Sequence, residues 1–368
     1  MSSLTCNQTF HPLSKSIGDQ SYPSSSPAWQ VCFTKDGKYL ACCFGAPDPC
    51  IRIWNVESNG AFVYVTTLQG VQERTIRSIA FAPTTLPILA AGSFDGTVCI
   101  WEGDQDADFE CIAQLEGHEN EVKGVCWNGT GSLLATCGRD KTVWLWECYL
   151  PGTVGGSEEG EFECLSVLNG HEGDVKSIQF APSHDQWGDG DEILLSAGYD
   201  DSIKCWAEDA GDWYCAATLK AHSSTVWCIS LTPGGSRLFS ASDDQSLGIF
   251  KCYTLKEKKE HYPDEKGSNG LWKCVGKLPN AHSSTIYSVD CAPVKSGHGR
   301  VASAGGDNRI QIYREAMGST SGSPMFSLDT AVTLSCDVHS VCWHPRDGSL
   351  LASASDDGCV RVWNYKTS

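Results

Sequence analysis

Four residues in the middle of the chain have side chains that could move protons or hold one another by hydrogen bonds: His118, Thr136, Asp140 and Trp146. An indole N–H and a hydroxyl can donate, a carboxylate can accept, and an imidazole can bridge the two. A carboxylate inside a sheet is tolerated only when such donors satisfy it. We therefore interpret the four as one buried structural network and expect no catalytic residues, because Asp140 already engages His118 and no nucleophile–base pair converges in a cleft.

The elements that would position these residues follow from the local pattern of the chain. Short runs of alternating apolar residues are typical of β-strands, and Gly- and Asn-rich stretches between them are typical of turns. Gly117-His118 opens a turn, and Asp140 stands in the last turn. Strands are predicted at 122–127, 133–137 and 143–146, with a turn at 128–131.

The same pattern recurs along the whole chain, and each copy places an aspartate six residues before an aromatic residue. The pairs are Asp48/Trp54, Asp95/Trp101, Asp140/Trp146, Asp200/Trp206, Asp244/Phe250, Asp307/Tyr313 and Asp357/Trp363. The opening histidine recurs at His171, His222 and His282 and is absent from the first, second and seventh copies, where Ser24, Gln72 and Leu334 align. The complete network is expected only in the third and fourth copies, which should be the most rigid: His118, Thr136, Asp140 and Trp146, then His171, Ser196, Asp200 and Trp206.

Successive aspartates lie about 45 to about 60 residues apart, and the shorter figure is the period of a four-stranded propeller blade. Seven copies predict an all-β, seven-bladed propeller, formed as a single domain by residues 1–368. No strand follows Lys366, so the N-terminal segment, at about residues 5–17, is expected to complete the last blade. The longer spacings predict insertions at the rim: 149–161, 183–191, 254–270 and 315–324.

The composition excludes several classes of function. The formal charge of −18 would repel phosphate backbones, so nucleic acid is not an expected partner. No run of about 20 apolar residues is present, and the N-terminus lacks the pattern of a signal peptide. We expect a cytoplasmic protein that does not span a membrane.

The chain has 20 cysteines, but their spacing does not predict a metal site. No C-x-x-C motif occurs, and most cysteines stand where strands usually carry Val, Ala or Thr. Free cysteine packs as a small hydrophobic residue. No metal and no cofactor is expected.

Two positions in each copy should project onto one face around the central channel. They are the residue after the first apolar position of the innermost strand and the residue before the turn aspartate. Arginine and aromatic residues at such places are typical of interface hot spots and would suit an acidic or aromatic peptide end. The predicted partner-binding residues are Arg139, Arg77, Lys123, Lys176, Trp227, Tyr287, Trp29, Phe94, Tyr199 and His339. The alternative is that the aromatics pack one blade on the next and that Arg139 pairs with a carboxylate such as Glu121.

The Gly-His pairs at 117–118 and 170–171, the turn aspartates and the closing tryptophans resemble the WD40-repeat family. A narrower resemblance, over the second to seventh copies, is to the WD40 subunits of the cytosolic iron–sulfur protein assembly (CIA) targeting complex. It depends on the segments 109–111, 115–123, 134–141, 143–147, 199–202, 212–219 and 224–227 and on the Asp-Asp pairs at 243–244 and 356–357. Some members carry Leu-Tyr-Arg or Leu-Tyr-Lys at the end of the fourth blade, where a cochaperone can dock, whereas this chain has Cys205-Trp206-Ala207.

The resemblance implies a non-catalytic scaffold that docks assembly factors and client apoproteins in the cytoplasm. A second location in the nucleus is compatible with this role. Its implied partners are a MIP18-family assembly protein, a HEAT-repeat adaptor, an iron-only-hydrogenase-like protein and apo iron–sulfur proteins. One alternative is a generic WD40 adaptor, either a ubiquitin-ligase substrate receptor or a subunit of a chromatin complex. Another is a metal-binding protein, which elemental analysis would distinguish.

Overall fold

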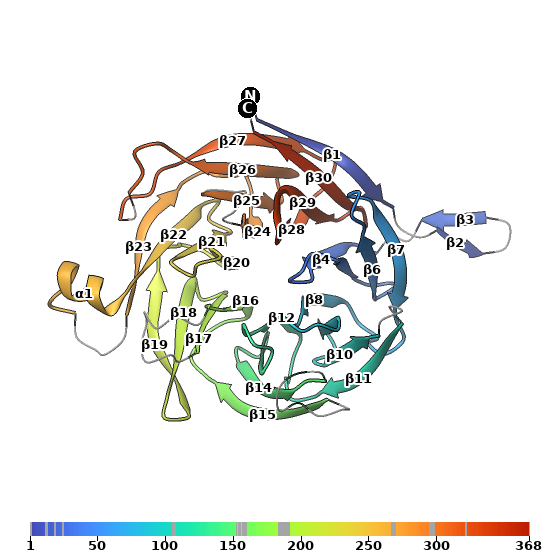
Figure 1. Cartoon of the computed structure of the whole chain (residues 1–368), viewed down its shortest axis with the longest axis horizontal. Helices are drawn as coiled ribbons and strands as arrows, with labels where there is room; N and C mark the ends of the chain where they lie inside the picture. Colours follow the sequence, from blue (N-terminus) through green and yellow to red (C-terminus); the bar gives the residue numbers. More distant parts are fainter. Residues whose placement is uncertain are drawn as a thin grey trace.

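The computed structural model describes residues 2–11, 14–17, 20–23, 26–104, 108–151, 153, 156, 160–182, 192–265, 270–293, 299–320 and 322–367. These residues form seven four-stranded antiparallel sheets arranged as the blades of a ring (Figure 1). The prediction of a seven-bladed all-β propeller is therefore confirmed.

Within each blade the strands follow one another from the channel to the rim. Blade 1 has β4 (Ala28–Phe33), β5 (Tyr39–Phe44), β6 (Cys50–Val56) and β7 (Phe62–Leu68). Blade 2 has β8 (Ile76–Phe81), β9 (Ile88–Ser93), β10 (Val98–Gly103) and β11 (Phe109–Leu115), and blade 3 has β12 (Val122–Trp127), β13 (Leu133–Gly138), β14 (Val143–Tyr149) and β15 (Glu161–Leu168). Blade 4 has β16 (Val175–Phe180), β17 (Ile193–Gly198), β18 (Ser202–Asp209) and β19 (Asp212–Lys220).

The remaining blades have the same order. Blade 5 has β20 (Val226–Leu231), β21 (Arg237–Ser242), β22 (Leu247–Tyr253) and β23 (Leu271–Leu278). Blade 6 has β24 (Ile286–Cys291), β25 (Arg300–Gly305), β26 (Arg309–Glu315) and β27 (Phe326–Thr333). Blade 7 has β28 (Val338–His344), β29 (Asp347–Ser355) and β30 (Val360–Lys366), and β1 (Ser3–Phe10) is its fourth strand.

The ring closes where β1 pairs antiparallel with β30, from Ser3 opposite Lys366 to Phe10 opposite Val360. The predicted closure by the N-terminal segment is confirmed, but its bounds were wrong, because the closing strand spans residues 3–10. Phe10 then packs on Trp54 of blade 1, with ring centroids 4.8 Å apart. The next strand, β2 (Ser14–Ile17), pairs instead with β3 (Gln20–Pro23) in a separate hairpin.

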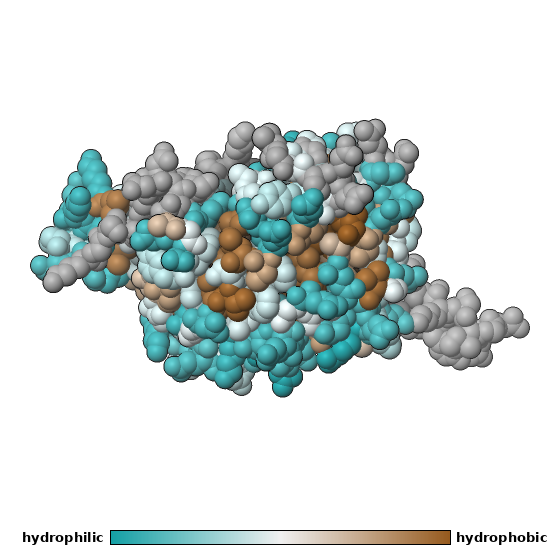
Figure 2. All heavy atoms as spheres, turned by 90° about the horizontal axis from the view of Figure 1, so that it is seen from below, coloured by the Kyte–Doolittle hydropathy of each residue, from teal (hydrophilic) through white to brown (hydrophobic). Residues whose placement is uncertain are grey.

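The hydrophobic core lies between neighbouring blades. Each of its clusters combines side chains from two adjacent sheets; one, for example, joins Ile100 of blade 2 to Leu134 and Trp146 of blade 3. The ring is seen edge-on in Figure 2, with apolar atoms in a band between hydrophilic faces. The outer strands contribute exposed apolar side chains to the rim, among them Val63, Tyr64, Leu165, Val167, Tyr214 and Leu328.

The insertion at 254–270 was expected to be a loop, and the structure corrects this, because it contains the helix α1 (Leu255–His261). Thr254 and Glu257 form a capping box in which each side chain accepts a hydrogen bond from the other's backbone N–H. The insertion at 183–191 lies outside the described residues, as does part of that at 149–161. Within the described part of the chain, no helix has the length and apolar character needed to cross a membrane.

Candidate functional site

The networks of blades 3 and 4 bring together the residues that the sequence pattern pairs. His118 Nδ1 lies 2.7 Å from Asp140 Oδ2, and His118 Nε2 lies 2.9 Å from Thr136 Oγ1. Trp146 Nε1 donates to the same hydroxyl over 3.1 Å. In blade 4, His171 contacts Asp200 and Ser196 at 2.9 and 2.7 Å, and Trp206 donates to Ser196 over 2.8 Å. Each hydroxyl thus bridges an imidazole and an indole in the blade interior.

The turn carboxylates of blades 3 and 4 are stabilised in their ionised form. Burial alone would raise the pKa of Asp140, but hydrogen bonds from His118 and Thr142 hold it below its usual value. Asp200 is in the same situation, and the bonds from His171 and Ser202 place its pKa well below the ordinary range. In these two blades, the carboxylate, the imidazole and the hydroxyl therefore hydrogen-bond to one another.

Partial networks occur in other blades. Blades 5 and 6 keep the imidazole, hydroxyl and carboxylate, with His222 2.6 Å from Ser240 and His282 2.7 Å from Ser303. Their closing residues, Phe250 and Tyr313, lack an indole N–H, so the bond to the hydroxyl is lost. In blade 2, Gln72 takes the place of the histidine and donates to the carbonyl of Ala91 over 2.9 Å. Ser24, aligned there in blade 1, lies outside the described residues.

Eight of the ten predicted partner-binding residues line one cavity of about 240 Å³ at the channel mouth: Trp29, Arg77, Phe94, Lys123, Lys176, Trp227, Tyr287 and His339. We call this cavity the mouth. Seven of these residues, all except Phe94, occupy the second position of an innermost strand, and Phe94 precedes the turn aspartate Asp95. The mouth therefore opens on the face that carries the turn aspartates.

The mouth combines cations with aromatic rings. Lys123 Nζ lies 3.9 Å from the centroid of Phe94, Arg77 Cζ lies 5.1 Å from that of Trp29, and Lys176 Nζ lies 5.1 Å from that of Trp227. The aromatic side is continuous, because His339 packs on both Trp29 and Tyr287 at 4.4 and 5.5 Å. Such cation–π geometry stabilises cations in a partly desolvated place.

Carboxylates neutralise only some of the positive charges at the mouth. Lys123 is paired with Glu121 at 2.6 Å and Lys176 with Asp174 at 3.0 Å. Among the described residues, no carboxylate forms an ion pair with Arg77. Burial lowers the pKa of Arg77, and burial followed by the nearby charge of Arg77 lowers the pKa of His339. An added negative charge at the mouth would relieve this repulsion.

A smaller space of about 80 Å³ in the channel is lined by the mouth residues other than Phe94 and by the residues that follow them in the innermost strands, four of which are serines. The hydroxyl oxygen of Ser78 accepts the backbone N–H of Val125 in the next blade over 3.1 Å, and that of Ser288 accepts the N–H of Val341 over 3.1 Å. Ser177 and Ser340 make the same bond to blades 5 and 1 at 3.2 and 3.3 Å. Because each oxygen accepts in this bond, its own O–H remains able to donate.

Two predicted binding residues lie outside the mouth. Arg139 is 3.5 Å from Glu121, and its side chain is 56 % exposed. Tyr199 is also exposed and lies 5.6 Å from Lys176. Arg139 therefore pairs with Glu121, as in the alternative interpretation of the sequence. It lies on the same face as the mouth but outside it.

Asp290 is a titratable residue of the innermost strand β24 that the sequence pattern did not indicate. Its carboxylate accepts from the backbone N–H of Trp343 over 2.7 Å and from the hydroxyl of Ser230 over 3.1 Å, and burial raises its pKa to about 6. The only sequence signal is an acid in an otherwise apolar strand. Within the described residues, no group of three or more His, Cys, Asp and Glu side chains is arranged to hold a metal.

The ring of four-stranded blades with turn aspartates defines a propeller of the WD-repeat class. The family model "WD domain, G-beta repeat" matches residues 19–55, 62–102, 109–147, 162–207, 213–251, 272–314 and 324–364, one match for each blade.

Curated relatives narrow this class. The chain is 33 % identical to a "Probable cytosolic iron-sulfur protein assembly protein 1" of Scheffersomyces stipitis, over 92 % of this chain and 96 % of the relative. The proteins of the same name in Candida glabrata and Vanderwaltozyma polyspora are 35 and 38 % identical, covering 92 and 80 % of this chain and 95 and 82 % of theirs. The chain belongs to the cytosolic iron–sulfur protein assembly protein 1 family of WD-repeat propellers, which confirms the resemblance seen in the sequence.

Proposed function

We propose that this protein is a non-catalytic scaffold of cytosolic iron–sulfur protein assembly that brings assembly factors and client apoproteins together. The observation that carries the proposal is the similarity, along nearly the whole chain, to proteins named for this process. The buried histidines hydrogen-bond to an aspartate and a hydroxyl of their own blade, and this favours a structural role for them. The cation–aromatic mouth provides a surface on which a polypeptide can bind.

The proposed partners are a MIP18-family assembly protein, a HEAT-repeat adaptor, an iron-only-hydrogenase-like protein and apo iron–sulfur proteins. The proposed location is the cytoplasm, with a further pool in the nucleus. Affinity purification of the tagged chain followed by mass spectrometry tests both the process and the partners. Recovery of ubiquitin-ligase or chromatin subunits in their place would contradict the proposal and favour a generic WD40 adaptor.

We further propose that the mouth, together with Arg139 and Tyr199 beside it, binds an acidic or aromatic segment of a partner. Arg77→Gln should reduce capture of the recovered assembly factor about tenfold, a loss of about 1.4 kcal/mol, because it removes the cation that lacks a carboxylate. Binding is measured by titration against the purified factor, and thermal melting reports the fold. Lys38→Gln is the matched control, since Lys38 is 72 % exposed and stands in the β4–β5 connection on the opposite face. Equal affinity of Arg77→Gln and the unmodified protein would remove the mouth from the binding site.

Arg139→Glu separately tests the surface that lies outside the mouth on the same face. The new carboxylate would stand beside Glu121 and should weaken capture, mainly through a slower association that depends on salt. The melting temperature should stay nearly unchanged, because exposed substitutions usually alter the free energy of unfolding by less than about 0.5 kcal/mol. Unchanged capture with an unchanged melt would show that Arg139 makes only its structural pair.

A further inference from the structure

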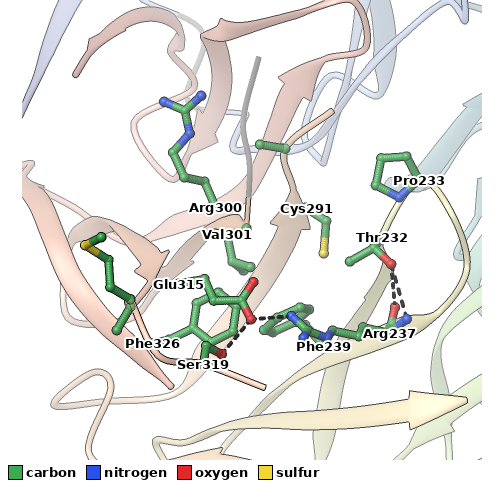
Figure 3. A pocket seen from close by; sticks show the side chains of 14 residues that line it. Thr232, Pro233, Arg237, Phe239, Cys291, Arg300, Val301, Glu315, Ser319 and Phe326 are labelled. Atoms are coloured by element: carbon green, nitrogen blue, oxygen red, sulfur yellow. Dashed lines mark hydrogen bonds and ion pairs between the residues drawn. The ribbon is translucent and has the colours of Figure 1, made fainter. Parts of the chain in front are cut away.

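A second cavity lies on the face opposite the mouth, between blades 5 and 6, and has a volume of about 520 Å³ (Figure 3). It is formed where six segments meet: the connection after β20, the start of β21, the end of β24, the start of β25, the end of β26 with the connection that follows, and the start of β27. In an antiparallel blade, these ends all lie on the face away from the turn aspartates. We call this cavity the blade 5/6 pocket.

The walls of the blade 5/6 pocket are largely apolar and partly aromatic. Phe239 and Phe326 meet edge to face, with centroids 5.2 Å apart, and Val301 stands beside them. Met317, fully exposed in the insertion between β26 and β27, is also a lining residue. Methionine side chains adapt to irregular apolar partners, and an exposed one at a pocket is typical of a binding surface.

One carboxylate, that of Glu315, is held in a fixed position at the wall, and the guanidinium groups of Arg237 and Arg300 also line the pocket. Its Oε1 accepts hydrogen bonds from Arg237 Nη1 and Ser319 Oγ, each over 2.7 Å, and its side chain is 24 % exposed. Among the described residues, no donor is recorded for its other oxygen, Oε2. Gly299, with a φ of +58°, allows this placement, because a Cβ there would lie 2.6 Å from Oε2. The pocket therefore has an oriented carboxylate with a lone acceptor beside aromatic walls.

We propose that the blade 5/6 pocket binds an aromatic side chain that carries a hydrogen-bond donor at its tip, a tryptophan or tyrosine of a partner polypeptide. The ring packs against Phe326, behind which Phe239 lies buried, and its N–H or O–H donates to Glu315 Oε2. An aliphatic side chain would leave this carboxylate oxygen desolvated and without a donor, which is costly. Tryptophan and tyrosine are the residues that combine a large apolar body with one donor.

The pocket can be probed with single amino-acid derivatives on the full chain. The sequence has three methionines, so protein labelled with carbon-13 at the methionine methyl groups gives a simple NMR spectrum in which Met317 reports on the pocket. N-acetyl-L-tryptophanamide should shift the Met317 signal in a saturable way. N-acetyl-L-leucinamide should bind at least fivefold more weakly, roughly the cost of leaving one buried acceptor without its donor.

Two variants distinguish the parts of the recognition. Glu315→Gln should weaken tryptophanamide binding about fivefold, since the bond loses its charge assistance, and should leave leucinamide binding unchanged. Phe326→Leu removes one aromatic wall while keeping an apolar side chain, and should weaken tryptophanamide more than leucinamide. Thermal melting reports whether each variant is folded.

Three results would overturn the proposal: no saturable shift with tryptophanamide, equal affinity for the two amides, or no effect of either folded variant. The proposal goes beyond the scaffold function and does not depend on it. Its failure would leave the mouth experiments unaffected, because the two cavities lie on opposite faces.

Discussion

Thr136→Val is expected to lower the free energy of unfolding by about 2–6 kcal/mol, although valine has nearly the shape of threonine. The hydroxyl of Thr136 serves two buried groups, His118 Nε2 and Trp146 Nε1. Its loss leaves both without a partner, and each orphaned buried polar group costs about 1–3 kcal/mol. The cost therefore comes from lost hydrogen bonds and not from a cavity.

Chemical denaturation of the two proteins measures this effect, and Thr333→Val is the matched control, because Thr333 is exposed on the outer strand β27. A double-mutant cycle with Trp146→Phe isolates the indole contact. In the Thr136→Val background, removal of the indole N–H should cost less than it does in the unmodified protein. A control and a Thr136→Val variant of equal stability would show that the blade network contributes nothing.

Asp290→Asn is expected to stabilise the protein by about 2 kcal/mol at pH 8 and to have little effect below pH 4. Burial raises the pKa of Asp290 from its ordinary value of 3.8 to about 6. Between these values the folded state holds the proton that the unfolded chain has released, so stability falls as the pH rises through that window. A shift of about two units corresponds to about 3 kcal/mol, which we reduce because the residue is not wholly enclosed.

Asparagine fits the same contacts, since its carbonyl can accept from Trp343 and its amide can donate to Ser230. Unfolding curves from pH 4 to pH 8 test the prediction, with the exposed Asp264→Asn as the control. The difference between Asp290→Asn and the unmodified protein should grow from pH 4 to pH 6 and then level off. A difference that is constant over this range would mean that the carboxyl does not titrate there.

Much of the ring could be predicted because its determinants are local. An aspartate six residues before an aromatic fixes a turn and the following strand, and this spacing occurs in every blade. The same regularity places Trp29, Arg77, Lys123 and their equivalents together at the mouth, since the second residue of each innermost strand points the same way.

The remaining features depend on geometry that spacing does not encode. Phe94, Arg139 and Tyr199 occupy equivalent turn positions, yet only Phe94 reaches the mouth, because Arg139 turns to Glu121. The pKa of Asp290 is raised by burial and lowered by hydrogen-bonding groups of three blades, and the blade 5/6 pocket is assembled from six separate segments. Helix α1 was missed because its capping box lies in a short charged stretch without apolar periodicity.

The pairing of Ser3 with Lys366 has a consequence for synthesis on the ribosome. Strand β1 can pair with β30 only after residues 360–366 have emerged, so blade 7 is completed after the other six blades have been synthesised. Until then β1 lacks its partner strand. An unpaired strand can form backbone hydrogen bonds with another polypeptide chain. Nascent chains truncated before residue 360 should therefore be held by chaperones or aggregate.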